Sequence, residues 1–223
     1  MNLTDLHRRL LADVLAIGTP YPLVITGGYA VQAHGLVDRL SQDLDVATEN
    51  PASIAEIVAV VSGGLVTRGW SVRQIETGAL SGRLIATDPQ SGDECEVDVL
   101  KEAFWSPPAQ TEYGPVLALD DVIGTKVRAL ADRGAVRDLI DVHAASQHRT
   151  TADLETLGRR HARFEFSLQD LRDRLNGAEW WDDKDYTDYG LNPGQLADLR
   201  TWALAWAAEL DARLYAEENP DEV

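Results

Sequence analysis

The chain has 223 residues, of which 44% are hydrophobic, so it can bury a full core, and at about 150 residues per domain it should form one large domain or two small ones. Its 37 acidic and 20 basic residues give a net charge of −17, which excludes nucleic-acid binding through a generally cationic surface. No run approaches the roughly 20 apolar residues of a membrane span, and charged residues interrupt the N-terminal region where a signal peptide needs an apolar run. We therefore expect a cytoplasmic protein that contacts no membrane.

The charge is not spread evenly along the chain. Residues 165–223 hold fifteen acids and five bases, whereas residues 128–163 hold seven arginines against five acids. The single cysteine, Cys95, has no partner for an internal disulfide, so we expect a small buried residue in a reducing compartment.

The first predicted elements are a helix, a strand and a second helix. Apolar residues at three- or four-residue steps predict an amphipathic helix over 2–17. A short apolar run predicts a strand over 23–26, which should stop at Gly27-Gly28. The next helix is expected to begin at Tyr29.

Strands dominate the prediction for the following part of the chain. Polar and apolar residues alternate through 43–47, which is the period of a half-buried strand. A helix over 51–61 should open at Pro51 and end at Gly63-Gly64. Three successive strands, joined by turn residues as an antiparallel meander, are predicted over 70–77, 83–88 and 94–101.

From Leu119 onward the pattern is almost entirely helical. Asp120-Asp121 should cap the first of these helices, and Gly134 should end it. The remaining helices are predicted over 135–146, 151–163, 167–175 and 193–216. The chain therefore divides into an α/β domain, residues 1–115, and an all-helical C-terminal domain, residues 116–223.

Three carboxylates carry the strongest chemical signal. Asp43 and Asp45 share one face of a predicted strand, and Asp98 points to the same kind of face of a later strand. Carboxylates gathered on one sheet surface repel one another unless a cation lies among them, and hard oxygen ligands suit Mg²⁺ or Mn²⁺. We therefore predict a metal site, for which Glu96 is an alternative ligand because it shares the face of Asp98.

Phosphoryl transfer is the reaction that such a site suits. Metal ions can bridge a triphosphate and neutralise the leaving pyrophosphate, with Asp98 placed to take a proton from the attacking hydroxyl. The Gly27-Gly28 turn would allow backbone N–H groups to approach the phosphates at a helix N-terminus.

The order of these features resembles that of a known superfamily. A strand, Gly27-Gly28, a helix, a strand with Asp43-x-Asp45 and a later strand with Asp98 resemble the nucleotidyltransferases of the polymerase-β type. The resemblance implies an α/β (α+β) nucleotidyltransferase fold, in which a mixed, twisted sheet is flanked by helices and followed by an all-helical C-terminal region.

A narrower resemblance rests on residues 27–45. Gly27 to Ala30, followed by the Arg-x-Ser-x-Asp-x-Asp segment of residues 39–45, is similar to the AbiEii/AbiGii toxin family, which includes MenT-type toxins. In this segment Arg39 and Ser41 would hold the entering loop or contact phosphate, and the alternative is a loop arginine that pairs with Asp38.

The second half of the chain adds to this resemblance. The family carries a lysine on a helix after the third strand carboxylate, and Lys126 matches it as a single cation aimed at the triphosphate. The family's Lys-Asp-x-x-Asp motif is approximated by residues 137–141, where Arg137 replaces the lysine. Asp138 would orient Lys126 or a metal ligand; equally, Asp138 and Asp141 could be a helix cap and a solvent-facing acid.

The expected activity follows from the resemblance. It implies a metal-dependent enzyme that moves a nucleoside monophosphate from an NTP to an acceptor, with a tRNA 3′ end as acceptor and a cognate antitoxin as partner. RNA would dock on the arginine-rich residues 128–163, because phosphate contacts dominate nucleic-acid affinity; an ordinary charged helix surface is the alternative. Two other functions remain open: nucleotide transfer to a small hydroxyl compound such as a cationic antibiotic, which an acidic chain would attract, and a non-catalytic regulatory module.

A tryptophan pair lies in the acidic C-terminal part. Trp180-Trp181 is followed by Asp182, Asp183 and Asp185, whose charge would repel phosphate. We therefore expect the two indoles to pack against the helical domain, with a base-stacking platform as the alternative.

Overall fold

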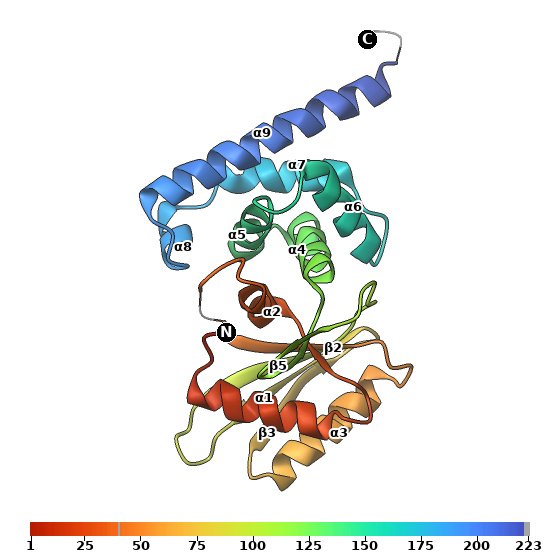
Figure 1. Ribbon diagram of the computed structural model, residues 1–223, viewed down its shortest axis with the longest axis vertical. Helices are drawn as coiled ribbons and strands as arrows, with labels where there is room; N and C mark the ends of the chain where they lie inside the picture. The colour runs from red at the N-terminus through yellow and green to blue at the C-terminus, as the bar shows by residue number, and fades with distance from the viewer. Residues whose placement is uncertain (40, 221–223) are drawn as a thin grey trace. The chain divides into compact units, whose positions relative to one another are not determined.

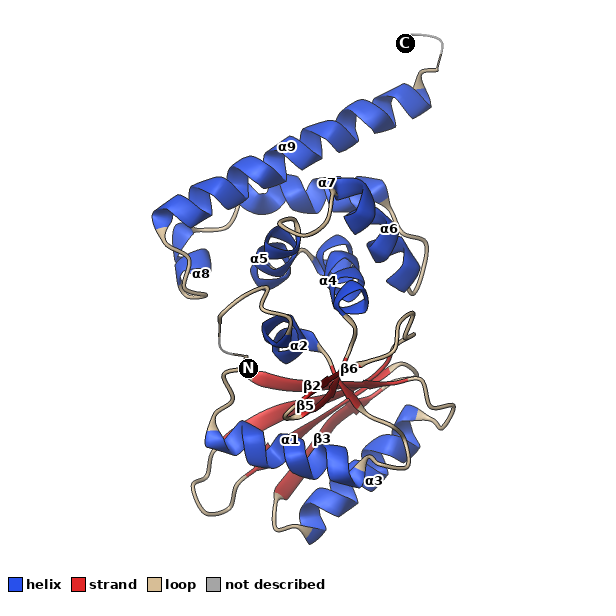
Figure 2. Ribbon diagram, in the orientation of Figure 1, coloured by secondary structure: helices blue, strands red, loops and turns tan. Residues whose placement is uncertain are grey.

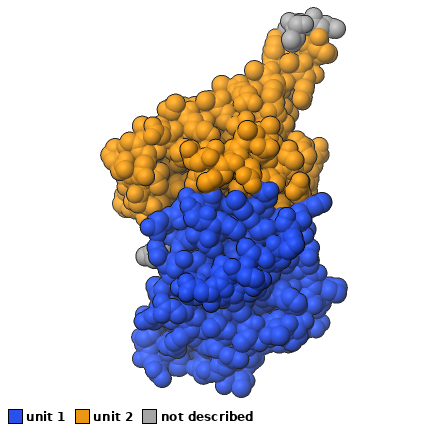
Figure 3. All heavy atoms as spheres, viewed as in Figure 1, with its two compact units in different colours: residues 1–122 blue, residues 123–223 orange. Residues whose placement is uncertain are grey.

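The computed structural model describes residues 1–39 and 41–220, and the chain within them divides into two compact units. Figure 3 colours unit 1, residues 1–122, in blue and unit 2, residues 123–223, in orange. Unit 1 contains all the strands that the structure describes, and unit 2 is built from helices. None of the helices in the described ranges is both long enough and apolar enough to cross a membrane.

The core of unit 1 is a seven-stranded mixed sheet in the order β3-β4-β5-β2-β1-β7-β6. Its strands are β1 Val24–Ile25, β2 Asp43–Thr48, β3 Ser71–Thr77, β4 Ser81–Thr87, β5 Glu94–Lys101, β6 Ala109–Thr111 and β7 Gly114–Val116. The pairs β2–β5 and β1–β7 are parallel and the others antiparallel. The predicted mixed sheet and the meander β3-β4-β5 are confirmed.

The two faces of this sheet differ in chemistry. Leu44, Val46, Val97 and Val99 are at most 1% exposed and belong to one apolar core with residues of α1 (Asp5–Ile17) and α3 (Ile54–Thr67). Figure 2 shows these two helices against the sheet. The alternation of strand residues turns the intervening acids of β2 and β5 to the opposite face, where α2 (Gly27–Ala33) packs on β2.

Several predicted helix boundaries in unit 1 are wrong. Helix α1 begins at Asp5 and not at Asn2, and α3 begins at Ile54, after the Ser53 cap, and not at Pro51. Helix α3 does not end at Gly63-Gly64 but continues to Thr67, because its apolar face goes on to the buried Leu65. A Cβ on Gly64 would lie 2.6 Å from the Ile17 side chain, so the glycine permits close packing of α1 on α3. Helix α2 begins at Gly27, two residues before the predicted start.

The hairpin of β6 and β7 was not predicted. Its strands have three residues each, and Pro115 has no N–H for the ladder, so the local sequence indicates a break. The two strands pair with each other at three positions, and pairing of Ile25 with Val116 joins the hairpin to the rest of the sheet. Strands this short are recognised by their pairing and not by a local pattern.

Unit 2 is helical, as predicted, and Figure 1 labels its main elements. Helix α4 Leu119–Arg133 begins in unit 1 and continues into unit 2, and Gly134, with φ of 63°, follows its end. The other elements are α5 Val136–Ala145, α6 Thr151–His161, α7 Leu168–Asn176, the 3₁₀ helix η1 Gly177–Glu179, α8 Asp183–Thr187 and α9 Pro193–Glu218. Among the helices of residues 123–220, η1 and α8 are the ones that the sequence did not predict.

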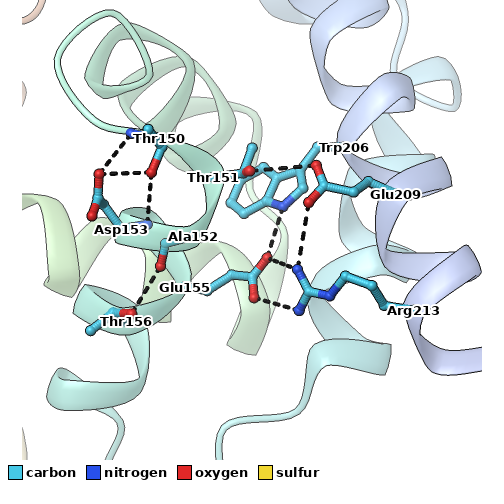
Figure 4. A network of polar contacts seen from close by, with 9 residues as sticks. All are labelled: Thr150, Thr151, Ala152, Asp153, Glu155, Thr156, Trp206, Glu209 and Arg213. Carbon is cyan, nitrogen blue, oxygen red and sulfur yellow. Dashed lines mark hydrogen bonds and ion pairs between the residues drawn. The ribbon is translucent and has the colours of Figure 1, made fainter. Parts of the chain in front are cut away.

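A buried carboxylate ties α6 to α9. Glu155 is 7% exposed and accepts hydrogen bonds from Trp206 Nε1 at 3.2 Å and from Arg213 at 2.9 and 2.7 Å (Figure 4). Both carboxylate oxygens of Glu155 accept hydrogen bonds, and the guanidinium of Arg213 compensates the negative charge. The long helix α9 is therefore attached to α6 at this point.

Candidate active site

The Gly27-Gly28 turn lies directly against the aspartate strand. Gly27 has φ of 60°, a left-handed conformation, and a Cβ there would lie 1.8 Å from Asp45 Oδ2. A Cβ on Gly28 would lie 2.3 Å from Ser41 Oγ. The backbone also connects the two segments, because Thr26 N donates to Asp45 O at 2.9 Å. Only glycine therefore allows this helix N-terminus to approach Asp45 and Ser41 so closely.

The loop before β2 is held by its own side chains. Ser41 Oγ donates to Asp43 Oδ1 at 3.0 Å, and the Arg39 side chain comes within 3.7 Å of the place where a Gly28 Cβ would be. Arg39 and Ser41 thus lie at the Gly-Gly turn as well as in the loop that enters the aspartate strand. Their role toward phosphate stays a prediction.

Behind this loop lies a buried polar pair that the sequence did not indicate. His7 Nδ1 and Tyr29 Oη share a hydrogen bond of 2.5 Å, and Tyr29 Oη also donates to Ser41 O at 3.3 Å. Burial lowers the pKa of His7, against an opposing effect of the Asp43 charge, and burial raises the pKa of Tyr29. Both groups are therefore neutral, and they support the loop that carries Ser41 and Asp43.

The register of the strands brings four carboxylates to one face. In the parallel pair β2–β5, Asp43 is opposite Glu96 and Asp45 is opposite Asp98. This arrangement confirms that Glu96 and Asp98 share a face, and it places Asp98 in the row next to Asp45. The face that carries these acids is the one on which the Gly-Gly turn lies.

Asp98 has a partner that was not predicted. Arg83 on β4 is opposite Asp98, and its Nε and Nη2 donate to Asp98 Oδ1 and Oδ2 at 2.8 Å each. The same guanidinium lies 3.1 Å from Glu96 Oε1. These hydrogen bonds raise the pKa of Arg83 further above its usual value. The signal was present in the sequence, because alternation along the meander turns Arg83 to the face of Asp98.

The donor set suits a divalent cation at Asp43 and Asp45. Two carboxylates from alternate positions of one strand, next to a serine hydroxyl, offer the hard oxygen ligands that Mg²⁺ prefers. In residues 1–39 and 41–220 no three His, Cys, Asp or Glu side chains are grouped as a metal site would require, and Asp98 is engaged by Arg83. Participation of Asp98 as a third metal ligand therefore stays a prediction.

Unit 2 holds the other predicted site residues in a buried ionic cluster. Lys126 Nζ lies 2.9 Å from Asp141 Oδ2 and 3.9 Å from Asp138 Oδ1, and Arg133 makes a two-point contact with Asp138 at 2.7 and 2.9 Å. Asp138 and Asp141 are at most 1% exposed, so neither is a solvent-facing acid. The nearer partner of Lys126 is Asp141, which the sequence left among the alternatives.

Solved structures share this fold. MenT4, a nucleotidyltransferase toxin from Mycobacterium tuberculosis H37Rv, superposes with a TM-score of 0.60 at 19% identity over 94% of this chain and 84% of that one. JHP933 from Helicobacter pylori superposes with a TM-score of 0.58 at 16% identity over 97% of this chain and 98% of that one. At these identities the likeness establishes the nucleotidyltransferase fold alone.

Sequence comparison identifies the family. No curated protein sequence matches the chain. The family model described as "Nucleotidyl transferase AbiEii toxin, Type IV TA system" matches residues 9–210, which include the Gly-Gly turn, the aspartate strands and the ionic cluster of unit 2. The chain therefore belongs to the AbiEii family of nucleotidyltransferase toxins, and it is a nucleotidyltransferase.

Proposed function

We propose that this nucleotidyltransferase transfers a nucleoside monophosphate from an NTP to the hydroxyl of an RNA acceptor, a tRNA 3′ end, as the toxin of a toxin–antitoxin pair. The observation that carries the proposal is the contact of the Gly27-Gly28 helix N-terminus with the Asp43-x-Asp45 strand. An anion-binding helix end next to two carboxylates suits a metal-bound triphosphate. The reaction would take place in the cytoplasm, with a cognate antitoxin as partner.

The residues act as follows in this proposal. Asp43 and Asp45 hold Mg²⁺ or Mn²⁺, which when bound supplies Lewis-acid polarisation of the phosphates. The backbone at Gly27-Gly28 binds phosphate oxygens, and Arg39 and Ser41 hold the loop beside them. Asp98, oriented by Arg83, accepts the proton of the attacking hydroxyl. The hydroxyl oxygen forms a bond to the α-phosphorus as the bond to pyrophosphate breaks.

The cluster of unit 2 has a separate role. Lys126 neutralises charge on the triphosphate, and Asp138 and Asp141 hold its ammonium group in place.

The proposal also includes the domain assignment, with residues 1–115 as the catalytic domain and residues 116–223 as the helical domain.

Transfer of labelled nucleotide tests the proposed function. Purified protein is mixed with total tRNA, Mg²⁺ and each of the four α-labelled NTPs, and label in RNA is measured. We expect transfer from at least one NTP, loss of transfer on chelation of the metal, and loss of about 100-fold or more in Asp43→Asn and Asp45→Asn, since these variants remove charges that hold the reactants in place.

The matched control is Asp93→Asn, an exposed aspartate in the turn between β4 and β5. This variant should keep wild-type transfer and wild-type melting temperature. Label that moves to a small hydroxyl compound and never to RNA would replace the RNA acceptor by the small-molecule alternative.

A further inference from the structure

A pocket of about 260 Å³ opens in unit 2 beside the exposed tryptophan pair. We call it the Trp pocket. Its lining residues come from the end of α4, from α7 and from η1 with the turn that follows; they are Arg133, Gly134, Asp173, Arg174, Gly177, Trp180 and Trp181. The pocket therefore joins part of the arginine-rich segment 128–163 to the tryptophan pair.

Trp180 does not pack against the helical domain as predicted, whereas Trp181 is more than half buried. Trp180 is 80% exposed and Trp181 42% exposed, so one large apolar ring is almost wholly in water. An exposed indole of this kind is available for stacking, because every nucleobase presents a flat π-face. For Trp180 the predicted packing is wrong, and the stacking alternative becomes the better interpretation.

The acids that follow the tryptophans have local structural partners. Asp182 and Asp185 form the capping box of α8, and Asp183 pairs with Arg200 at 2.7 Å. These partners reduce the repulsion that the bare sequence indicates. At physiological ionic strength, charges beyond about 8 Å are also largely screened.

The charge inside the pocket favours an anion. Asp173 is paired with Arg172 at 2.8 Å, and Arg133 is paired with the buried Asp138. Arg174 is exposed, and within residues 1–39 and 41–220 its guanidinium has no hydrogen bond or ion pair. The pocket thus combines two indoles with one uncompensated planar cation, which is suited to phosphate.

The pocket is connected to the predicted site lysine. Lys126 and Arg133 lie seven residues apart on α4, which is about two turns or 10.5 Å along one side of the helix. Both contact Asp138. A nucleotide in the Trp pocket would therefore lie close along α4 to the cation that we propose binds the triphosphate.

We propose that the Trp pocket binds one unpaired nucleotide of the acceptor RNA, with its base stacked on Trp180 and its phosphate bound by Arg174. This inference rests on the proposed function, in which the acceptor is RNA. A basic peptide segment is the competing occupant, and the free cation of Arg174 disfavours it. The pocket would act in holding the acceptor strand and have no part in the chemical step.

Binding is measured on the full chain by fluorescence anisotropy of a labelled, unstructured single-stranded RNA octamer, without NTP. We expect the Kd of Trp180→Ala to rise about 5- to 150-fold, which corresponds to the ~1–3 kcal/mol of one stacked base. Trp180→Phe should restore most of the affinity, and Arg174→Gln should weaken binding and reduce its salt dependence. The control is Phe164→Ala, because Phe164 is 89% exposed in the same unit and lies outside the pocket.

Transfer assays on the same variants separate this inference from the proposed function. If Trp180→Ala raises the KM for RNA and leaves the KM for NTP and kcat unchanged, the result supports both the RNA-binding pocket and the proposed function. Wild-type labelling of RNA with an unchanged KM and Kd in Trp180→Ala overturns the inference and leaves the function. RNA binding that depends on Trp180, without any RNA labelling by the wild type, overturns the function and leaves the pocket. Tighter binding of an oligolysine peptide than of RNA, lost in Trp180→Ala, assigns the pocket to a basic protein and overturns the inference.

Discussion

At the scale of single residues, the site depends on two glycines that have no room for a side chain. Gly27 combines a left-handed φ with a Cβ position 1.8 Å from Asp45 Oδ2. Gly27→Ala should therefore add about 1–2 kcal/mol of backbone strain and displace Asp45. We expect nucleotidyl transfer to fall by about 100-fold or more, because a shift of about 1 Å in a reactive group has that effect.

A matched substitution separates this effect from a general intolerance of alanine. Gly35 also has a positive φ, of 70°, but no heavy atom lies within 4 Å of its Cβ position. Gly35→Ala should lower the melting temperature, because alanine strains the backbone at a positive φ, but it should keep the transfer activity of the wild type. Equal loss of activity in both variants would contradict the role given to the Asp45 contact.

Arg83 is a partner of Asp98 that was not predicted, although strand alternation turns it to the same face. Its two hydrogen bonds to Asp98 orient both carboxylate oxygens, which a lysine cannot reproduce. We expect Arg83→Lys to lower kcat by about 10- to 100-fold, as is typical when a residue that orients a reactive group is changed. Arg73→Lys on the neighbouring β3 is the control, and similar kinetics in the two variants would mean that Arg83 only stabilises the sheet.

The buried His7 predicts how stability depends on pH. Burial holds its pKa below the usual 6.5, so the unfolded chain takes up the proton first as the pH falls. The contribution of the neutral His7 to the free energy of unfolding is therefore complete above about pH 6.5, and it is lost as the pH falls toward the lowered pKa of the folded protein. His7→Gln should reduce the decrease in unfolding free energy between about pH 7 and 5.5. An unchanged slope in His7→Gln would contradict the prediction.

At the scale of elements, α3 carries two glycines with opposite requirements. Gly64 faces Ile17 of α1, where a Cβ would lie 2.6 Å away, whereas Gly63 has open space. In urea unfolding, Gly63→Ala should stabilise the protein by about 0.5–1 kcal/mol, because alanine is the better helix former. Gly64→Ala should destabilise it by about 1–3 kcal/mol through overpacking. The reverse order would mean that α1 and α3 are not in close contact.

The elements also show where sequence patterns were sufficient to predict secondary structure and where they were not. The meander β3-β4-β5 was predicted because each strand is long and alternates clearly. The hairpin of β6 and β7 was not, because three-residue strands carry no pattern and become strands only by pairing, β6 with β7 and β7 with β1. The predicted end of α3 at Gly63-Gly64 was wrong, because tertiary packing at Gly64 outweighed the low helix propensity of glycine.

At the scale of the whole molecule, the charge of −17 should oppose folding through self-repulsion. Raising NaCl from about 10 to 300 mM screens this repulsion and should raise the melting temperature by about 2–4 °C, or on the order of 1 kcal/mol. Replacing Glu217 and Glu218 at the end of α9 by Gln should reduce this increase. A melting temperature that does not change with salt in either protein would show that the acids are already compensated.

The sequence by itself determined which residues are candidates for the site and the order in which they occur. A glycine pair after a strand, Asp43-x-Asp45 in alternation and a later Asp98 need only local periodicity to be placed on strands. These features were sufficient to predict the mixed sheet, the helical second half and the family.

The tertiary structure decided which of these groups meet. The pairing of Arg83 with Asp98 depends on strand register, and the pairing of Lys126 with Asp141 depends on how α4 and α5 pack. The exposure of Trp180 depends on where η1 ends. The physical reason is common to all three: periodicity determines the face to which a side chain points, but its partner is set by contacts between segments distant in sequence, which local patterns do not encode.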